Sequence, residues 1–467
     1  QVVEKVPDPP RDSRVSTQPG ATAAPPLDAR ARRQRIYAQA LPIIGGMASQ
    51  NLLNLVDAWM IGALGAAALA GVGLASFLVF VAVAFISGLA PSVQSIAAQR
   101  YGAGRFGEAA RALNGGLLLS LAIGIPVSVL LIAFAPSIMA ALNPDPAVQE
   151  AGAGYLMIRL VAVAFVGMNF AFRGYWSAID RARYYFVTIV SVHVLNVAIS
   201  YPLIFGLLGL PALGVHGAAI GTAASLMVGT LLHIGLGLRF AAEDGLLRKA
   251  PQRDEIARLL RLGIPNAVQQ FLFAAGFTAL FWIVGQIGTQ ELAVAHVLVT
   301  FTLVAVLPGL GFGIAAASLA AQAIGRGAFD EAAHWPWAVY KVSLPIFIAI
   351  AAAALLATDP LLALFLRDDA LVAIGSTPLR LFGAGVLIDA VGLILMHALL
   401  GAGAARLVMV TGVGLQWLCF LPAAYLLGPI LGLGLTAVWL AMVAWRGAQA
   451  VIFTLAWQGG SWRQLRV

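Results

Sequence analysis

The chain has 467 residues, of which 61% are hydrophobic and only 10% are charged, and its mean hydropathy is +0.91. Soluble proteins carry about 25% charged residues, so this chain has too few charges to cover a water-soluble protein of its length. The composition therefore indicates a polytopic membrane protein. The one cysteine, Cys419, excludes an internal disulfide, and its apolar surroundings predict a buried thiol.

The first 35 residues are polar and rich in proline and arginine, and we expect a disordered cytoplasmic tail at 1–35. Apolar stretches that could cross a bilayer core of about 30 Å follow. Because they lack the alternation of membrane β-strands, they predict an all-α polytopic membrane protein whose last residues, 458–467, form a cytoplasmic C-terminal tail. The twelve predicted transmembrane helices lie near residues 41–63, 67–98, 113–135, 152–172, 185–206, 213–237, 264–286, 291–322, 341–358, 377–399, 405–427 and 431–455.

Basic residues gather on one side of this predicted topology. Most of the 28 lysines and arginines fall in the tails and loops on the side of the N-terminus, above all in 100–111 and 239–261. The excess of positive charge in cytoplasmic loops predicts that both termini are cytoplasmic, in a plasma or inner membrane. It also accounts for the net charge of +8 without a nucleic-acid partner.

The chain contains an internal repeat. A shift of 223 residues places Pro42 on Pro265 and aligns two segments that share Gln, Gly, Phe and Glu, which begin at Ala98-Gln99 and at Ala321-Gln322. Six spans preserve orientation, so the repeat predicts two parallel six-helix lobes with a cavity between them. We expect an N-lobe at 36–237, a cytoplasmic linker with a short amphipathic helix at 238–262, and a C-lobe at 263–457.

Two acidic residues, Asp57 and Asp389, lie well inside predicted spans. A carboxylate at the bilayer centre costs about 2.5–3.5 kcal/mol on the insertion scale, so such residues normally face a cavity and mark an ion or proton path. Gln50, Asn54 and Asp57 follow helical spacing and share a face. A polar contact between two helices is the alternative interpretation of this stripe.

Other polar residues inside the spans are candidates for the cavity wall. His397 lies two turns after Asp389, and Asn196 and Ser200 share one helix face. Gln269 and Gln416 belong to the seventh and eleventh spans. Such side chains also join membrane helices by hydrogen bonds, which is the alternative for each of them.

Motifs of enzymes and nucleotide-binding folds are missing from the sequence. We therefore expect a protein that is not an enzyme, has no cofactor, and relies on an ion gradient for any active transport.

Several segments resemble the multidrug and toxic compound extrusion (MATE) family. They are Val56–Gly65, the repeated Ala-Gln-x-x-Gly-x-Gly turn, Asn196–Gly206 and Asp389–Gly403. The resemblance implies a twelve-helix antiporter that exports small organic cations in exchange for H⁺ or Na⁺. It also implies that Asp57 is the N-lobe coupling acid with Asn196 as its polar neighbour, and that Asp389 is the C-lobe acid.

The chain departs from this family pattern at two places. Members often carry Asp or Asn where Ser200 stands, and some carry an acid where the stretch 269–277 has none. Sodium needs several oxygen ligands, whereas desolvation of one lone carboxylate favours its protonated form, so we favour H⁺ and Asp57 as its carrier. A lipid-linked or polysaccharide flippase of the same broad superfamily is the alternative function, although only Arg159 and Arg446 would supply positive charge inside the spans. We expect a monomer.

Overall fold

The computed structural model describes residues 28–241 and 245–465, and within these ranges the chain forms helices and no β-strand. Ten of the described helical segments are long and apolar enough to cross a membrane, and the pair Pro146–Val161 and Val163–Ala178, bent by 47°, is a further span. Helix α1 (Ala29–Gly62) runs beside them as the twelfth, its hydropathy lowered by polar side chains such as Asn51 and Asn54. The predicted all-α membrane fold is confirmed.

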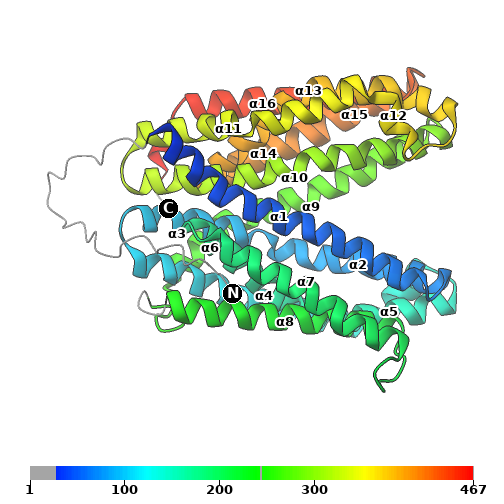
Figure 1. Ribbon diagram of the computed structural model, residues 1–467, viewed down its shortest axis with the longest axis horizontal. Helices are drawn as coiled ribbons and strands as arrows, with labels where there is room; N and C mark the ends of the chain where they lie inside the picture. Colours follow the sequence, from blue (N-terminus) through cyan, green and yellow to red (C-terminus); the bar gives the residue numbers. More distant parts are fainter. Residues whose placement is uncertain (1–27, 242–244, 466–467) are drawn as a thin grey trace, which may run out of the picture.

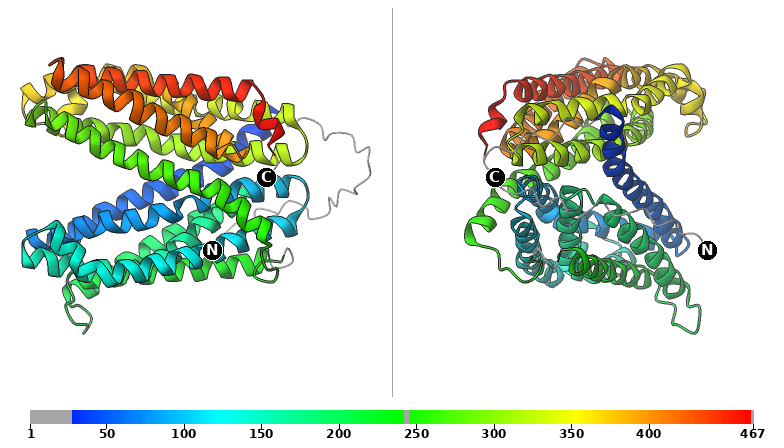
Figure 2. Two further views of the ribbon diagram at one scale, coloured as in Figure 1. Left: turned by 180° about the vertical axis from the view of Figure 1, so that it is seen from behind. Right: turned by 60° about the vertical axis from the view of Figure 1, so that its left-hand side comes forward.

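The helices form two bundles that lie close together at one end and diverge towards the other (Figures 1 and 2). The N-terminal bundle contains α1 (Ala29–Gly62), α2 (Ala66–Ser87), α3 (Leu89–Gly102), α4 (Phe106–Leu142), α5 (Pro146–Val161), α6 (Val163–Ala178), α7 (Ala182–Phe205) and α8 (Val215–Phe240). The C-terminal bundle contains α9 (Arg253–Gly285), α10 (Thr289–Gly325), α11 (Phe329–Leu356), α12 (Thr358–Ala363), α13 (Asp369–Gly401), α14 (Ala405–Gly414), η1 (Leu415–Phe420), α15 (Leu421–Tyr425), η2 (Leu426–Ile430) and α16 (Gly434–Gln458), followed by η3 (Ser461–Gln464).

The structure corrects the predicted start of the first helix. We expected residues 1–35 to be disordered, but α1 begins at Ala29. The carboxylate of Asp28 caps it by accepting a hydrogen bond from the backbone N–H of Ala31 at 2.6 Å, which satisfies one of the unpaired amides of a helix N-terminus. Residues 1–27 lie outside the described residues.

Two further expectations are wrong. The short helix predicted before span seven is the first part of one continuous helix, α9, which a capping box between Gln252 and Glu255 starts at Arg253. Cys419, expected to be buried, is exposed. It lies on the π-helical segment η1, and its surface position shows that an apolar run in a membrane helix does not distinguish a buried face from a lipid-facing one.

The first helix of each bundle crosses between the two bundles. The first half of α1 packs on the C-terminal bundle, where Tyr37 contacts Phe312 of α10 with 6.4 Å between ring centroids, and its second half packs on α7. Helix α9 does the reverse. It begins on the N-terminal bundle, where Glu255 and Arg100 form a buried ion pair at 2.6 Å, and continues into the C-terminal bundle.

The two bundles make direct backbone contact where α3 crosses α10. Gly102 lies against the backbone carbonyl of Gln322, and Gly325 lies against the backbone carbonyl of Gln99. A β-carbon at either glycine would overlap the facing oxygen. These four positions are the glutamines and glycines of the repeated turn, so the repeat brings its two copies together around a local two-fold relation.

We expect Gly325→Ala to lower the stability of the protein, because its new methyl group has to displace the backbone of α3, and overpacking of this kind costs about 1–3 kcal/mol. Thermal unfolding of the purified protein in detergent measures the effect. Gly73→Ala is the matched control, since a β-carbon at Gly73 meets nothing within 4 Å. Equal unfolding temperatures for the two variants would contradict the close contact.

Candidate transport site

A cavity of about 670 Å³ lies at the C-terminal bundle and is lined mainly by α9, α10, α13, α14 and α16, with Phe80 of α2 and Phe170 of α6 completing the wall. Three residues predicted from the sequence contribute to it, namely Asp389, Gln269 and Gln416. Most of the remaining wall is apolar, and Phe273 and Phe277 of α9 form part of it. Residues of both bundles therefore meet in one cavity with a few polar groups.

The acid in this cavity is paired. Asp389 Oδ1 lies 2.5 Å from Nη2 of Arg446, and the two side chains are 12% and 17% exposed. Arg446 also donates a hydrogen bond from Nη1 to Oε1 of Gln449 at 3.0 Å. Asp389 is therefore not an isolated carboxylate, because a largely buried acid needs a counter-charge in a low-dielectric interior and Arg446 supplies it.

The two predicted glutamines partly serve the packing of the wall. Gln416 donates to the backbone carbonyl of Phe273 at 3.1 Å, and its neighbour Trp417 donates to the carbonyl of Leu272 at 3.1 Å. Both lie on η1, a π-helical segment of a kind often found at functional sites. Gln269 Nε2 lies 3.6 Å from the sulfur of Met396, a weak interaction that leaves this amide available to a ligand.

The structure does not place His397 in the cavity wall. Its Nδ1 lies 2.8 Å from the backbone carbonyl of Leu393, and because a carbonyl only accepts, Nδ1 is the donor. The ring packs against Gly313 of α10. His397 thus contributes to the contact between α10 and α13.

In the N-terminal bundle, Asp57 is half-buried. No hydrogen bond or ion pair within the described ranges reaches it, but Arg159 of α5 lies close enough to attract its carboxylate. Arg159 itself has a buried Nε without a hydrogen-bond partner among the described residues. Asp57 is therefore an intramembrane acid that has a positive charge nearby and no direct partner.

The other residues of the predicted polar stripe are exposed and linked to α7. Gln50 Nε2 donates to Oδ1 of Asn54 at 3.1 Å, and Gln50 Oε1 lies 3.1 Å from Nε2 of His193. The other ring nitrogen of His193 lies 2.9 Å from Oγ of Ser49. The stripe of α1 is thus tied to α7 through His193, which bridges Gln50 and Ser49 of α1.

Asn196 and Ser200 are buried between α7 and α8. Asn196 donates from Nδ2 to Oγ1 of Thr222 at 2.9 Å, and Ser200 donates to Oδ1 of Asn196 at 3.4 Å. Gly221 of α8 packs directly on Ser200. Here the structure has the polar contact between helices that we considered as the alternative.

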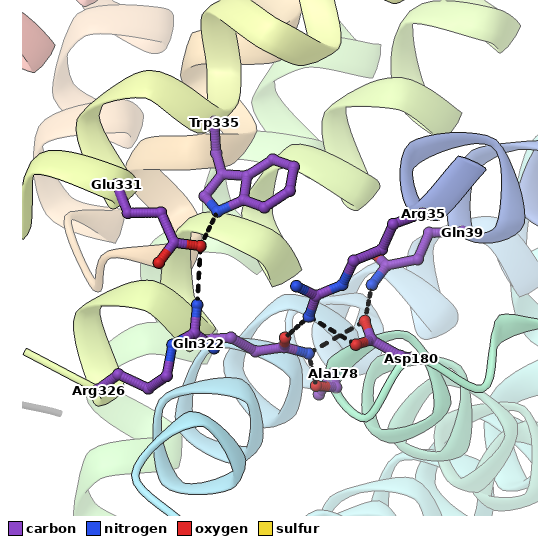
Figure 3. A network of polar contacts seen from close by, with 8 residues as sticks. All are labelled: Arg35, Gln39, Ala178, Asp180, Gln322, Arg326, Glu331 and Trp335. Atoms are coloured by element: carbon purple, nitrogen blue, oxygen red, sulfur yellow. Dashed lines mark hydrogen bonds and ion pairs between the residues drawn. The ribbon is translucent and has the colours of Figure 1, made fainter. Parts of the chain in front are cut away.

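A network of polar side chains joins the bundles at their close end (Figure 3). Arg35 of α1 donates from Nη2 to Oδ2 of Asp180 at 2.7 Å and also to the side chain of Gln322. Gln39 donates to the same carboxylate. Gln322 of α10 donates to the backbone carbonyl of Ala178 at 2.7 Å.

The repeat is visible in this network. Gln99 donates to the carbonyl of Gly401 at 3.1 Å, which corresponds to the bond from Gln322 to Ala178 after the shift of 223 residues. Two residues after each accepting carbonyl, the backbone has a positive φ, which is 59° at Asp180 and 95° at Gly403. Each glutamine therefore fixes the end of a helix in the opposite bundle.

Two functional features were not predicted. Arg446 was noted in the sequence as a charge inside a span, and the rule that intramembrane charges pair with one another would have suggested Asp389 as its partner. The repeated glutamine was noted as part of a turn, but nothing in the sequence indicated that it bonds across the two bundles.

A family model described as MatE matches residues 42–202 and 265–426. The chain belongs to the MatE family. The two matched segments begin 223 residues apart, which is the shift of the internal repeat. The predicted family is confirmed, and the chain is a membrane transporter rather than an enzyme.

Similar proteins cover nearly the whole chain. It is 27% identical over 429 residues to the probable multidrug resistance protein NorM of Agrobacterium fabrum, across 89% of this chain and 91% of that relative. It is 25% identical over 452 residues to the probable multidrug resistance protein NorM of Thermotoga maritima, across 93% and 94%. Its fold is similar to that of a multidrug resistance MATE family transporter in an outward-facing conformation, with a TM-score of 0.80 and 23% identity over 92% of this chain and 95% of that one.

We expect Asp180→Asn to loosen the close end, because hydrogen bonds to a charged acceptor contribute about 1.5–3 kcal/mol and Asp180 accepts from both α1 and α10. Spin labels at Ala103→Cys and Ala328→Cys, in a Cys419→Ser background, report the separation of the two bundles by pulsed electron resonance. The distance distribution should extend to longer values. Asp369→Asn, at the exposed start of α13, is the control, and a distribution unchanged by Asp180→Asn would contradict the role of the network.

Proposed function

We propose that this MatE transporter is a secondary active antiporter that exports small organic molecules in exchange for an ion, by alternating access of its two bundles. One observation carries the proposal: two bundles built from one repeat touch closely at one end and share a cavity to which both contribute. Rocking about the α3–α10 crossing would expose this cavity to either side of the membrane. The names of the relatives, probable multidrug resistance proteins, support drug-like cargo.

We propose that the close end faces the cytoplasm, so that the described state is open to the outside. The basic residues of the loops support this orientation, since Arg35, Arg100 and Arg326 all lie at the close end and cytoplasmic loops are enriched in such residues. One copy of the chain contains both bundles and the cavity, which supports a monomer as the working unit.

Cysteine labelling tests the orientation. In a Cys419→Ser background, Asn143→Cys between α4 and α5 should react with an impermeant maleimide from outside intact cells. Gln252→Cys, before α9, should react only after permeabilisation. Labelling of Gln252→Cys in intact cells would reverse the proposed orientation.

We propose that H⁺ is the coupling ion and that Asp57 carries it. The contrast between the two acids supports this choice: Asp389 has a counter-charge at 2.5 Å, whereas Asp57 is half-buried and has no direct partner in the described part of the chain. A desolvated carboxylate without a direct partner gains most from protonation. Asn196, engaged with Thr222, acts in this proposal as packing support on α7 and not as an ion ligand.

Asp57→Asn should abolish coupled transport and leave membrane insertion intact, because a neutral amide is less costly to bury than a carboxylate. In proteoliposomes without sodium, substrate addition should dissipate a preformed pH gradient with the wild-type protein. We expect at least a tenfold slower dissipation with Asp57→Asn. Asp254→Asn, exposed in the first turn of α9, is the control with the same loss of charge.

A strict sodium requirement for the wild-type exchange would overturn the choice of H⁺. The flippase alternative needs free positive groups for a phosphate-bearing headgroup, and the arginine of the cavity is already engaged with Asp389. The observed pairing therefore favours small organic cargo.

A further inference from the structure

The charges of the cavity sum to zero. Asp389 and Arg446 are in contact at 2.5 Å and both belong to the wall. The guanidinium of Arg446 also lies over the ring of Trp445, with 5.5 Å from Cζ to the centroid. The amides Gln269, Gln416 and Gln449, which also line the cavity, are neutral. A ligand that enters this cavity meets one negative and one positive group side by side.

This arrangement disfavours an organic cation without an anionic group. Such a cation would bind Asp389 only by displacing Arg446, and the displaced guanidinium would remain in an apolar wall without its counter-charge. Breaking a buried pair by removing one partner is strongly unfavourable, because an uncompensated charge stays behind. The same reasoning applies to an organic anion, which would leave Asp389 unpaired.

A zwitterion avoids this cost. Its ammonium group can take the place of Arg446 at Asp389 while its carboxylate takes the place of Asp389 at Arg446. One intramolecular ion pair is then exchanged for two intermolecular pairs, and no charge is left without a partner.

The rest of the wall fits an aromatic body on such a ligand. Phe273 and Phe277 form an edge-to-face pair with 5.1 Å between centroids, and Phe273 lies 6.5 Å from the ring of Trp445. These aromatic surfaces suit a ligand with a flat aromatic body.

We propose that Arg446 is the anion-binding residue of this cavity, and that the Asp389–Arg446 pair selects aromatic zwitterions over organic cations of the same shape. The proposal rests on the proposed export function and names its substrate class. It differs from the sequence-based expectation of a purely cationic substrate.

Two matched fluorescent probes test the selection. Nε-dansyl-lysine carries an ammonium and a carboxylate on one carbon, whereas Nε-dansyl-lysinamide keeps the ring and the ammonium and lacks the carboxylate. Binding of each to the purified full chain in detergent is measured by dansyl fluorescence. The wild-type protein should bind the zwitterion at least tenfold more tightly. Equal affinities, tighter binding of the amide, or no binding of either probe would overturn the proposal.

Variants test whether the Asp389–Arg446 pair causes the preference for the zwitterionic probe. Arg446→Gln frees Asp389 and should reverse the preference, so that the amide binds at least tenfold more tightly than the zwitterion. The double variant Asp389→Asn/Arg446→Gln removes both charges, leaves no unpaired ion, and should bring the ratio of affinities close to one. Arg380→Gln, on the exposed side of α13, is the control and should keep the wild-type ratio. A wild-type ratio in the double variant would overturn the role of the pair.

Efflux from cells separates this proposal from the export function. Accumulation of a panel of aromatic dyes and drugs is compared between cells that express the chain and cells that do not. If no compound is exported, the proposed function fails. If compounds are exported but cations leave as fast as matched zwitterions, the proposed function stands and the selection by Arg446 is wrong.

Discussion

Backbone-to-backbone contact between α3 and α10 is possible because the repeat places a glycine three residues after a glutamine in both helices. The glycines remove the side chains that would keep the two backbones apart, and the glutamines use the resulting proximity to reach helix ends in the opposite bundle. Small residues are the usual means by which membrane helices approach closely, since lipid offers no hydrophobic force to press them together.

Helices α1 and α9 also hold the two bundles together. Each of these helices begins on one bundle and ends on the other, so the two bundles are tied by continuous backbone as well as by side chains. The buried pair between Arg100 and Glu255 anchors the start of α9 on the N-terminal bundle. Arg35 and Asp180 anchor the start of α1 between the two.

The sequence predicted the helices, the repeat and the family, because hydropathy and a shifted alignment depend only on the order of residues. It also singled out Asp389, Gln269 and Gln416, which share the cavity. It did not separate cavity from packing for Ser200, Asn196 or His397, since an amide, a hydroxyl or an imidazole satisfies its hydrogen bonds equally well against a neighbouring helix. Residue spacing does not say which distant spans pack together, so only the rule that intramembrane charges pair with one another could have suggested the contact of Arg446 with Asp389.

The two bundles treat their intramembrane charges differently, and this has a consequence for coupling. In the C-terminal bundle the acid and the arginine are in contact, whereas in the N-terminal bundle Asp57 and Arg159 attract one another without forming an ion pair. If cargo exchanges at the first pair and the ion at the second acid, the two ligands do not compete for one carboxylate.

Coupling between cargo and ion then requires a structural element that can adopt two conformations, and binding at either site must shift the equilibrium between these conformations. The elements that both bundles share are the α3–α10 crossing and the exchanged helices α1 and α9, and α1 carries Asp57 at one end and Arg35 at the other. A change of charge at Asp57 therefore acts on the same helix whose start helps to hold the close end together.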